Sequence, residues 1–140
     1  MINHIPVIGV PGVALLLVYA LVRKSEEVKL VSLGLLVLIA LMAFAVFFTG
    51  DAGEKLVKDL PGVAEMYIDR HEEMADWTLV LTEILGALSL AGLVFRKRFG
   101  RIPNAIVVLV LVLSLITAVA AGVTANFGGQ IRHTEIRSGK

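Results

Sequence analysis

Four long apolar stretches dominate this sequence and together use most of its 140 residues. A run of about 20 apolar residues is what an α-helix needs to cross the hydrocarbon core of a bilayer, whereas a membrane-spanning β-strand needs only about ten. We therefore predict an all-α fold, an integral membrane four-helix bundle that forms a single domain over residues 1–140. The predicted spans cover residues 6–22, 30–48, 77–95 and 104–126.

The charged residues lie between these stretches and predict an orientation. The turn 23–29 holds three basic residues and the turn 96–101 holds four. Both turns follow odd-numbered spans, so they lie on one side, which the positive-inside rule places in the cytoplasm. The longer loop 50–76 carries three basic and eight acidic residues, which suits the outer side. Both termini are then expected outside as well.

The outer loop is expected to contain a short amphipathic helix over residues 52–60, ended by Pro61 and Gly62. The pattern that follows has helical spacing. It predicts that the helix of the third span begins between Gly62 and Glu65 and rises outside the membrane before entering it. Trp77 would mark the headgroup level, where an amphipathic indole prefers to lie.

Several function classes have no support in the sequence. The absence of cysteine excludes disulfides, thiolate metal sites, covalent c-type haem attachment and cysteine nucleophiles. A net charge of +1 and the lack of a basic recognition segment give no sign of nucleic-acid binding. Motifs for hydrolysis or nucleotide chemistry are missing too. The sequence favours a non-enzymatic electron carrier or accessory subunit over an enzyme.

The three histidines of the chain all fall at the predicted outer face. His4 precedes the first span, His71 precedes the third and His133 follows the fourth. Each stands at the end of a helix with small residues at helical spacing, which is typical of close helix packing in membranes. We therefore expect the histidines to converge into one polar cluster. The small-residue stripes are Gly9 and Gly12; Ala75, Thr78, Thr82, Gly86 and Ser89; and Ser114, Ala118, Gly122, Ala125 and Gly129.

Imidazole is a natural ligand for haem iron and for zinc or copper. Haem b would take His71 and His133 as axial ligands, with His4 as the alternative ligand or as a supporting hydrogen-bond donor. Arg70 and Arg132 directly precede two of these histidines and would lie near the haem propionates.

Two other interpretations of the histidines remain open. A non-haem zinc or copper site would use the same three histidines, completed by Glu72 or Glu135. Alternatively the histidines bind no cofactor and cap helices or contact headgroups, as in a structural or assembly subunit.

Glu83 is the one carboxylate clearly inside a predicted span. Ionisable groups at such depth are costly and usually face the bundle interior. We expect a protonated Glu83 that forms a hydrogen bond with a hydroxyl of the fourth span, such as Thr117 or Thr124. A proton path or a quinone site is the alternative.

The ends of the predicted helices carry a resemblance. Five segments resemble a widespread family of uncharacterised bacterial four-helix membrane proteins. They are Asn3-His4-Ile5-Pro6-Val7, Thr49-Gly50-Asp51-Ala52, Leu60-Pro61-Gly62-Val63, Asp69-Arg70-His71-Glu72-Glu73 and the most specific one, Gly128-Gly129-Gln130-Ile131-Arg132-His133-Thr134-Glu135-Ile136-Arg137. This resemblance implies a multi-pass protein of the bacterial inner membrane.

More remotely, the chain is similar to small cytochrome-b-like membrane domains of unknown function, which open with a His-Pro-x-x-x-His-Phe-Pro pattern. His4 and Pro11 keep the spacing of its first histidine and last proline, but Gly9 stands in place of the second histidine. The resemblance thus implies at most one haem. Together with the histidines it leads us to expect a haem b electron-transfer protein near the outer membrane face. Such a protein would be a subunit or partner of a redox complex, or a homo-oligomer.

Overall fold

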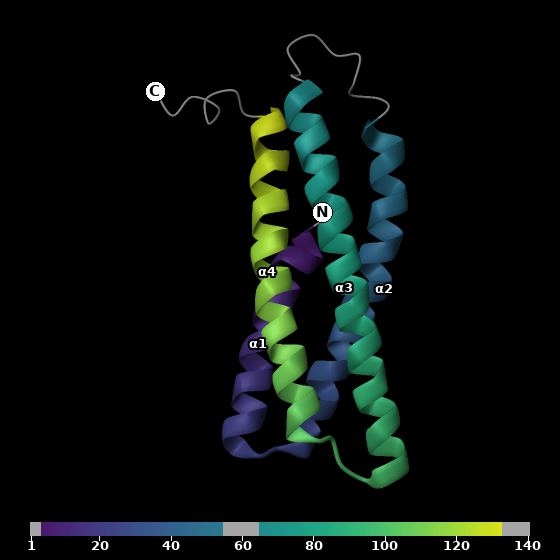
Figure 1. Ribbon diagram of the computed structural model, residues 1–140, viewed down its shortest axis with the longest axis vertical. Helices are drawn as coiled ribbons and strands as arrows, with labels where there is room; N and C mark the ends of the chain where they lie inside the picture. Colours follow the sequence, from purple (N-terminus) through teal and green to yellow (C-terminus); the bar gives the residue numbers. More distant parts are fainter. Residues whose placement is uncertain (1–3, 55–64, 133–140) are drawn as a thin grey trace.

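The fold is all-α, as the sequence predicts. The computed structural model describes residues 4–54 and 65–132, with side chains placed for residues 7–46 and 69–130. Four helices fill the described ranges, and Figure 1 shows them running side by side along one long axis. They are α1 (His4–Arg23), α2 (Glu26–Glu54), α3 (Glu65–Phe99) and α4 (Asn104–Arg132).

The four helices form a closed antiparallel ring. Each helix packs against its neighbour in sequence, and α1 completes the ring by packing against α4. The α1–α2 and α3–α4 turns lie at the same end of the bundle (Figure 1). We call this the basic end, because it carries the basic turns 23–29 and 96–101, and we call the other the histidine end, because His71 lies toward it.

The distribution of apolar side chains is that of a membrane protein. Leucines, valines and isoleucines cover the outside of the bundle, with Leu15 and Val22 more than 70% exposed. Large continuous exposed apolar surfaces are unusual in soluble monomers but match a hydrocarbon solvent. A narrow apolar core lies inside the ring. It consists of Val10, Val13, Leu17, Leu33, Leu36, Ile39, Leu85, Ile102, Val107 and Val110.

Three helices contain segments long and apolar enough to cross a membrane, namely Glu26–Val46, Asp69–Phe99 and Asn104–Gln130. In α1 the apolar segment with described side chains, Val7–Arg23, is shorter. The whole of α1 has 20 residues, which gives about 30 Å at about 1.5 Å per residue. That length equals the thickness of a typical hydrocarbon core, about 30 Å.

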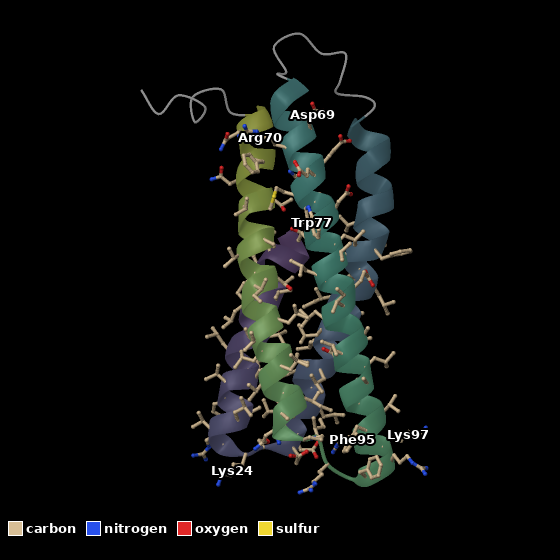
Figure 2. The ribbon with its side chains drawn as sticks, viewed as in Figure 1. Lys24, Asp69, Arg70, Trp77, Phe95 and Lys97 are labelled. Atoms are coloured by element: carbon tan, nitrogen blue, oxygen red, sulfur yellow. The ribbon has the colours of Figure 1, made fainter. Side chains whose placement is uncertain are left out.

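The helices differ in how far they extend at the histidine end. In Figure 1, α1 stops partway along the bundle, at about the height at which Figure 2 shows Trp77 in the same view. The other three helices continue beyond this height. Because Trp77 is 60% exposed and α1 ends at the same height, both features support a membrane boundary at this level.

The predicted helix boundaries need two corrections. α2 does not end at residue 48 but continues through Gly50 and Gly53 to Glu54, since each glycine inside a helix costs only about 1 kcal/mol. Residues 52–54 of the expected amphipathic loop helix therefore belong to α2, and its remainder lies outside the described residues. α4 likewise continues past Asn126 to Arg132. The start of α3 at Glu65 falls within the predicted interval.

The small-residue stripe of α3 is a packing seam, as predicted. Thr78, Thr82, Gly86 and Ser89 are all buried. The hydroxyls of Thr82 and Ser89 donate to the carbonyl oxygens of Thr78 and Leu85, so no hydroxyl is left without a partner. At Gly86 a Cβ atom would overlap the Cβ of Ala40. The absence of a side chain at Gly86 is what lets α3 approach α2 this closely.

The predicted stripe on α4 is wrong beyond Ala118, which still packs against the apolar core. Gly122 and Ala125 are exposed, and nothing lies within 4 Å of a Cβ built at Gly122 or Gly129. The face of α4 that packs inside the bundle is shifted by one residue from the predicted one. It consists of Ser114, Thr117, Ala121, Thr124 and Gly128. In α1, Gly12 also points away from the bundle.

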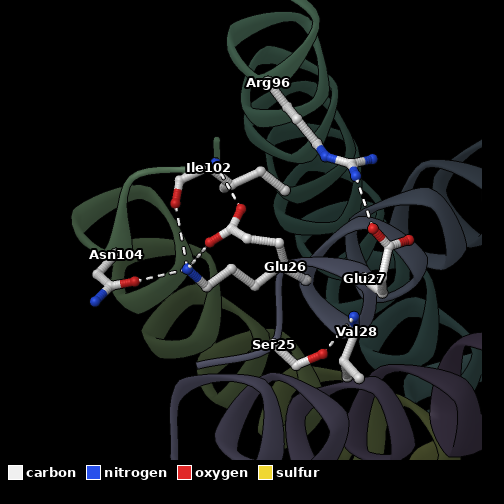
Figure 3. A network of polar contacts seen from close by, with 8 residues as sticks. Ser25, Glu26, Glu27, Val28, Arg96, Ile102 and Asn104 are labelled. Carbon is white, nitrogen blue, oxygen red and sulfur yellow. Dashed lines mark hydrogen bonds and ion pairs between the residues drawn. The ribbon is translucent and has the colours of Figure 1, made fainter. Parts of the chain in front are cut away.

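A buried lysine joins the two turns of the basic end (Figure 3). The Lys29 side chain is almost fully enclosed, and its Nζ donates to Glu26 Oε1 at 2.5 Å, Asn104 Oδ1 at 2.8 Å and the Ile102 carbonyl oxygen at 3.3 Å. Glu26 Oε2 accepts from the Ile102 backbone N–H at 2.9 Å. Since the ammonium has three hydrogens, these acceptors satisfy it completely. The contact holds the start of α2 to the start of α4.

Candidate functional site at the histidine end

His71 lies between α3 and α4, where the predicted histidine cluster would begin. It belongs to the part of α3 that precedes Trp77, and its side chain is half-buried. The ring atom Nδ1 lies 3.0 Å from the backbone carbonyl oxygen of Thr124 on α4. The imidazole is thereby attached to the neighbouring helix and does not point freely into solvent.

This hydrogen bond determines which ring nitrogen carries the hydrogen. A carbonyl oxygen only accepts hydrogen bonds, so Nδ1 must be the donor. In the neutral imidazole, Nε2 then has a free lone pair. A histidine that ligates a metal is commonly held in this manner, with the other nitrogen donating to a carbonyl or carboxylate. His71 is therefore oriented as a ligand would be.

Gly128 provides the space for this ring. A Cβ atom built at Gly128 would lie 3.0 Å from His71 Cε1 and 3.3 Å from Nδ1. Those distances are shorter than ordinary van der Waals contact between carbon atoms, which begins near 3.5 Å. The Cε1 edge of the imidazole consequently packs against the α4 backbone at a position where only glycine fits without adjustment.

Directly below His71 two threonines close the α3–α4 interface. The Oγ1 atoms of Thr78 and Thr124 are 2.8 Å apart, and both hydroxyls are within hydrogen-bond distance of the Met74 carbonyl oxygen. Thr124 Oγ1 also lies 3.0 Å from the Ala120 carbonyl oxygen. Interhelical hydrogen bonds of this kind bring helices together in membranes. They leave no room between α3 and α4 at this level.

The remaining predicted site residues are described only in part. Arg70 is exposed, and Glu72 is half-buried. His4 is the first residue of α1 and Arg132 the last of α4, but their side chains lie outside the described residues, as do His133 and Glu135 in full. The convergence of the three histidines remains a prediction. Within the described side chains, no group of three or more histidine, aspartate or glutamate residues is arranged to hold a metal ion.

The residues around His71 offer haem a ligand nitrogen but no space for the porphyrin along α3. The Nε2 lone pair is suited to an axial position. However, a porphyrin held by His71 along α3 would need open space beside the small-residue stripe from Thr78 to Ser89, and this stripe is buried by neighbouring helices. The porphyrin does not fit along that stripe.

The predicted hydrogen bond between Glu83 and the hydroxyl of Thr117 or Thr124 is not formed. Its Oε1 is enclosed and has no partner among the described residues. Thr117 Oγ1 donates to the Leu113 carbonyl oxygen, and Thr124 is engaged with Thr78 and Met74. Both hydroxyls are satisfied without the carboxyl, because threonine in a helix can bond to the carbonyl four residues earlier.

Sequence reasoning missed the roles of Thr124 and Gly128 as partners of His71. Their spacing could have predicted this face of α4. The steps from Thr117 to Ala121, Thr124 and Gly128 are of three and four residues, which follow one helix face. The adjacent series through Gly122 and Gly129 has equally small residues, so the sequence alone did not distinguish the two faces. Comparisons of the chain with protein families, curated proteins and solved structures gave no match.

Proposed function

We propose that this membrane protein is a haem b electron carrier of the histidine end, with His71 as one axial ligand. The observation that supports this proposal best is the hydrogen bond from His71 Nδ1 to the Thr124 carbonyl, because it leaves Nε2 available for iron. His133 is the first choice for the opposite ligand and His4 the alternative. Arg70, exposed beside His71, is suited to a propionate, with Arg132 in the same role.

The position of His71 supports an interfacial carrier. The residue precedes Trp77 on α3 by six positions, or about 9 Å of helical rise. A redox group held there would lie near one membrane surface, where an electron-transfer partner can approach it. Such a carrier would act as a subunit or partner of a redox complex, or as a homo-oligomer, and haem supplies the one-electron chemistry when it is bound.

A zinc or copper ion is the second candidate, and the closed α3–α4 interface favours it. A single ion needs no space for a planar ring, so the Thr78–Thr124 contact does not oppose it. Its ligands would be His4, His71 and His133, with Glu72 or Glu135 as an oxygen ligand. A protein with no cofactor, in which His71 only secures α3 to α4, is the structural alternative.

The orientation is proposed on the charge of the two short turns. The basic end would face the cytoplasm and the histidine end the outer side of a bacterial inner membrane. The resemblance at the helix ends supports this location.

Absorption spectroscopy and metal analysis separate the three candidates. The full chain, purified after expression with ample haem and metal, should show a Soret band if haem is bound. Stoichiometric zinc or copper without a Soret band would favour the ion. Absence of both would favour the structural role.

A further inference from the structure

Most basic side chains of the basic end have no acidic partner within the described residues. The turns 23–29 and 96–101 contain seven basic and two acidic residues. Both acidic residues form ion pairs within the protein chain, Glu26 with the buried Lys29 and the exposed Glu27 with Arg96 at 3.0 Å (Figure 3). The five other basic residues are exposed and form no ion pair within the described residues. They are Arg23, Lys24, Lys97, Arg98 and Arg101.

These five cations belong to the two turns that form the basic end of the bundle. Figure 2 shows Lys24 on one side of the basic end and Lys97 on the other. Lys29 holds the two turns that carry them together, because its Nζ bonds to the Ile102 carbonyl and to Asn104. The cations therefore form a rim around a fixed structure.

Apolar side chains lie directly next to this rim on the same helices. Val22 on α1 is 74% exposed and Val94 on α3 is 58% exposed. Phe99 is 61% exposed, and its ring packs against that of Phe95 at a centroid distance of 4.4 Å with a tilt of 36° between the ring planes. A lipid with an anionic headgroup fits this arrangement. Its headgroup would contact the cations, and its acyl chains would contact the neighbouring valines.

We infer that the rim binds the anionic headgroups of phospholipids in the leaflet at the basic end. The two carboxylates of these turns, Glu26 and Glu27, are already paired with Lys29 and Arg96, so the five remaining cations give the rim an excess of positive charge that favours anions. A basic residue near an anionic membrane surface contributes an attraction of about fivefold in binding. This inference is independent of any cofactor at the histidine end.

Lipid retention tests the inference with the full chain. The protein is reconstituted into vesicles of equal phosphatidylglycerol and phosphatidylcholine, re-extracted in a mild nonionic detergent, and its co-purified lipids are quantified by mass spectrometry. We expect phosphatidylglycerol to exceed phosphatidylcholine by at least about fivefold. The ratio should fall when salt is raised to about 0.5 M, since exposed charges are then screened.

Two matched variants make the test specific to charge. The variant Lys97→Gln/Arg98→Gln/Arg101→Gln should bring the lipid ratio close to that of the vesicle. The variant Lys97→Arg/Arg98→Lys/Arg101→Lys keeps every charge and should keep the enrichment. If the neutral variant does not fold, the salt dependence of the unmodified protein decides the question.

Three results would overturn the inference. One is equal retention of the two lipids by the unmodified protein, and another is full enrichment in the neutral variant. The third is displacement of phosphatidylglycerol by inorganic phosphate but not by sodium chloride of matched ionic strength. That last result would identify a site for free phosphate and not for a bilayer headgroup.

Discussion

His71 on α3 and Thr124 on α4 are joined by a hydrogen bond of 3.0 Å between the imidazole Nδ1 and the backbone carbonyl oxygen. The bond links residues 53 positions apart in the sequence, holds the ring in place and requires Nδ1 to carry a hydrogen. It combines a structural role, attaching two helices, with a chemical one, presenting Nε2.

Substitution of Gly128 should disturb the imidazole, whereas the same substitution at Gly129 should not. Both Gly→Ala changes gain up to about 1 kcal/mol of helix propensity. Only the methyl at position 128 meets His71, at 3.0 Å from Cε1, while the space around Gly129 is open. We expect Gly128→Ala to be less stable than Gly129→Ala by about 1 kcal/mol, and Gly128→Val by about 2 kcal/mol or more. Thermal unfolding in detergent measures this, and equal stability of the two alanine variants would show that the ring does not lie against Gly128.

Gly86→Ala should force α3 away from α2, because the new methyl would overlap the Ala40 side chain. Overpacking of this kind costs about 1–3 kcal/mol. Gly34→Ala is the control, since nothing lies within 4 Å of a Cβ at that position. Adding Ala40→Gly to Gly86→Ala moves the methyl to the opposite helix and should restore much of the lost stability. Failure of the double variant to recover, measured by thermal unfolding, would argue against this contact.

Lys29→Met should destabilise the bundle, although methionine is similar in length to lysine and its apolar side chain can be buried without a partner. The change removes three hydrogen bonds and leaves Glu26 without its ammonium partner. Breaking a fully buried ion pair costs about 3–5 kcal/mol. We expect about 2–3 kcal/mol here, since the Glu26 side chain is 37% exposed and keeps the Ile102 N–H. Lys24→Met, at an exposed position, should change the unfolding temperature little, and a similar loss in both variants would contradict the role of Lys29.

The proposed orientation predicts different labelling of the two ends. Cysteine introduced at Lys24, which is exposed in the basic turn, should be protected from an impermeant thiol reagent in intact cells. Cysteine introduced at Ser138 should react. Lys24 is a better site than Ser25, because the Ser25 hydroxyl accepts from the Val28 N–H at the start of α2. Labelling at position 24 with protection at 138 would reverse the orientation.

The sequence predicted the helices and one of the two seams because those features are local. Runs of apolar residues determine which segments enter the membrane, and the Thr78–Ser89 stripe is the only small-residue series on its helix. The α4 seam was misassigned by one residue because Gly128 and Gly129 are identical in kind. Only the rotation of α4 against α3 decides which of them meets His71, and that rotation follows from packing across the whole bundle.

The burial of Lys29 was not predictable for a similar reason. In the sequence it is one basic residue of a short charged turn, which usually means exposure to water. Its acceptors at Ile102 and Asn104 lie more than 70 positions away and meet it only when the two turns pack together. For the candidate site, the sequence identified His71, but its partner on α4 depended on the same long-range arrangement.

The spectrum of the purified full chain, oxidised and reduced, tests the central proposal most directly when it is recorded alongside His71→Ala and Glu83→Gln. We predict a low-spin haem b spectrum in the unmodified protein. It should be lost or converted to a five-coordinate form in His71→Ala and retained in Glu83→Gln, because Glu83 lies about 18 Å further along α3. An unmodified protein without a Soret band after expression with ample haem, or an unchanged low-spin spectrum in His71→Ala, would contradict the assignment of His71 as a haem ligand.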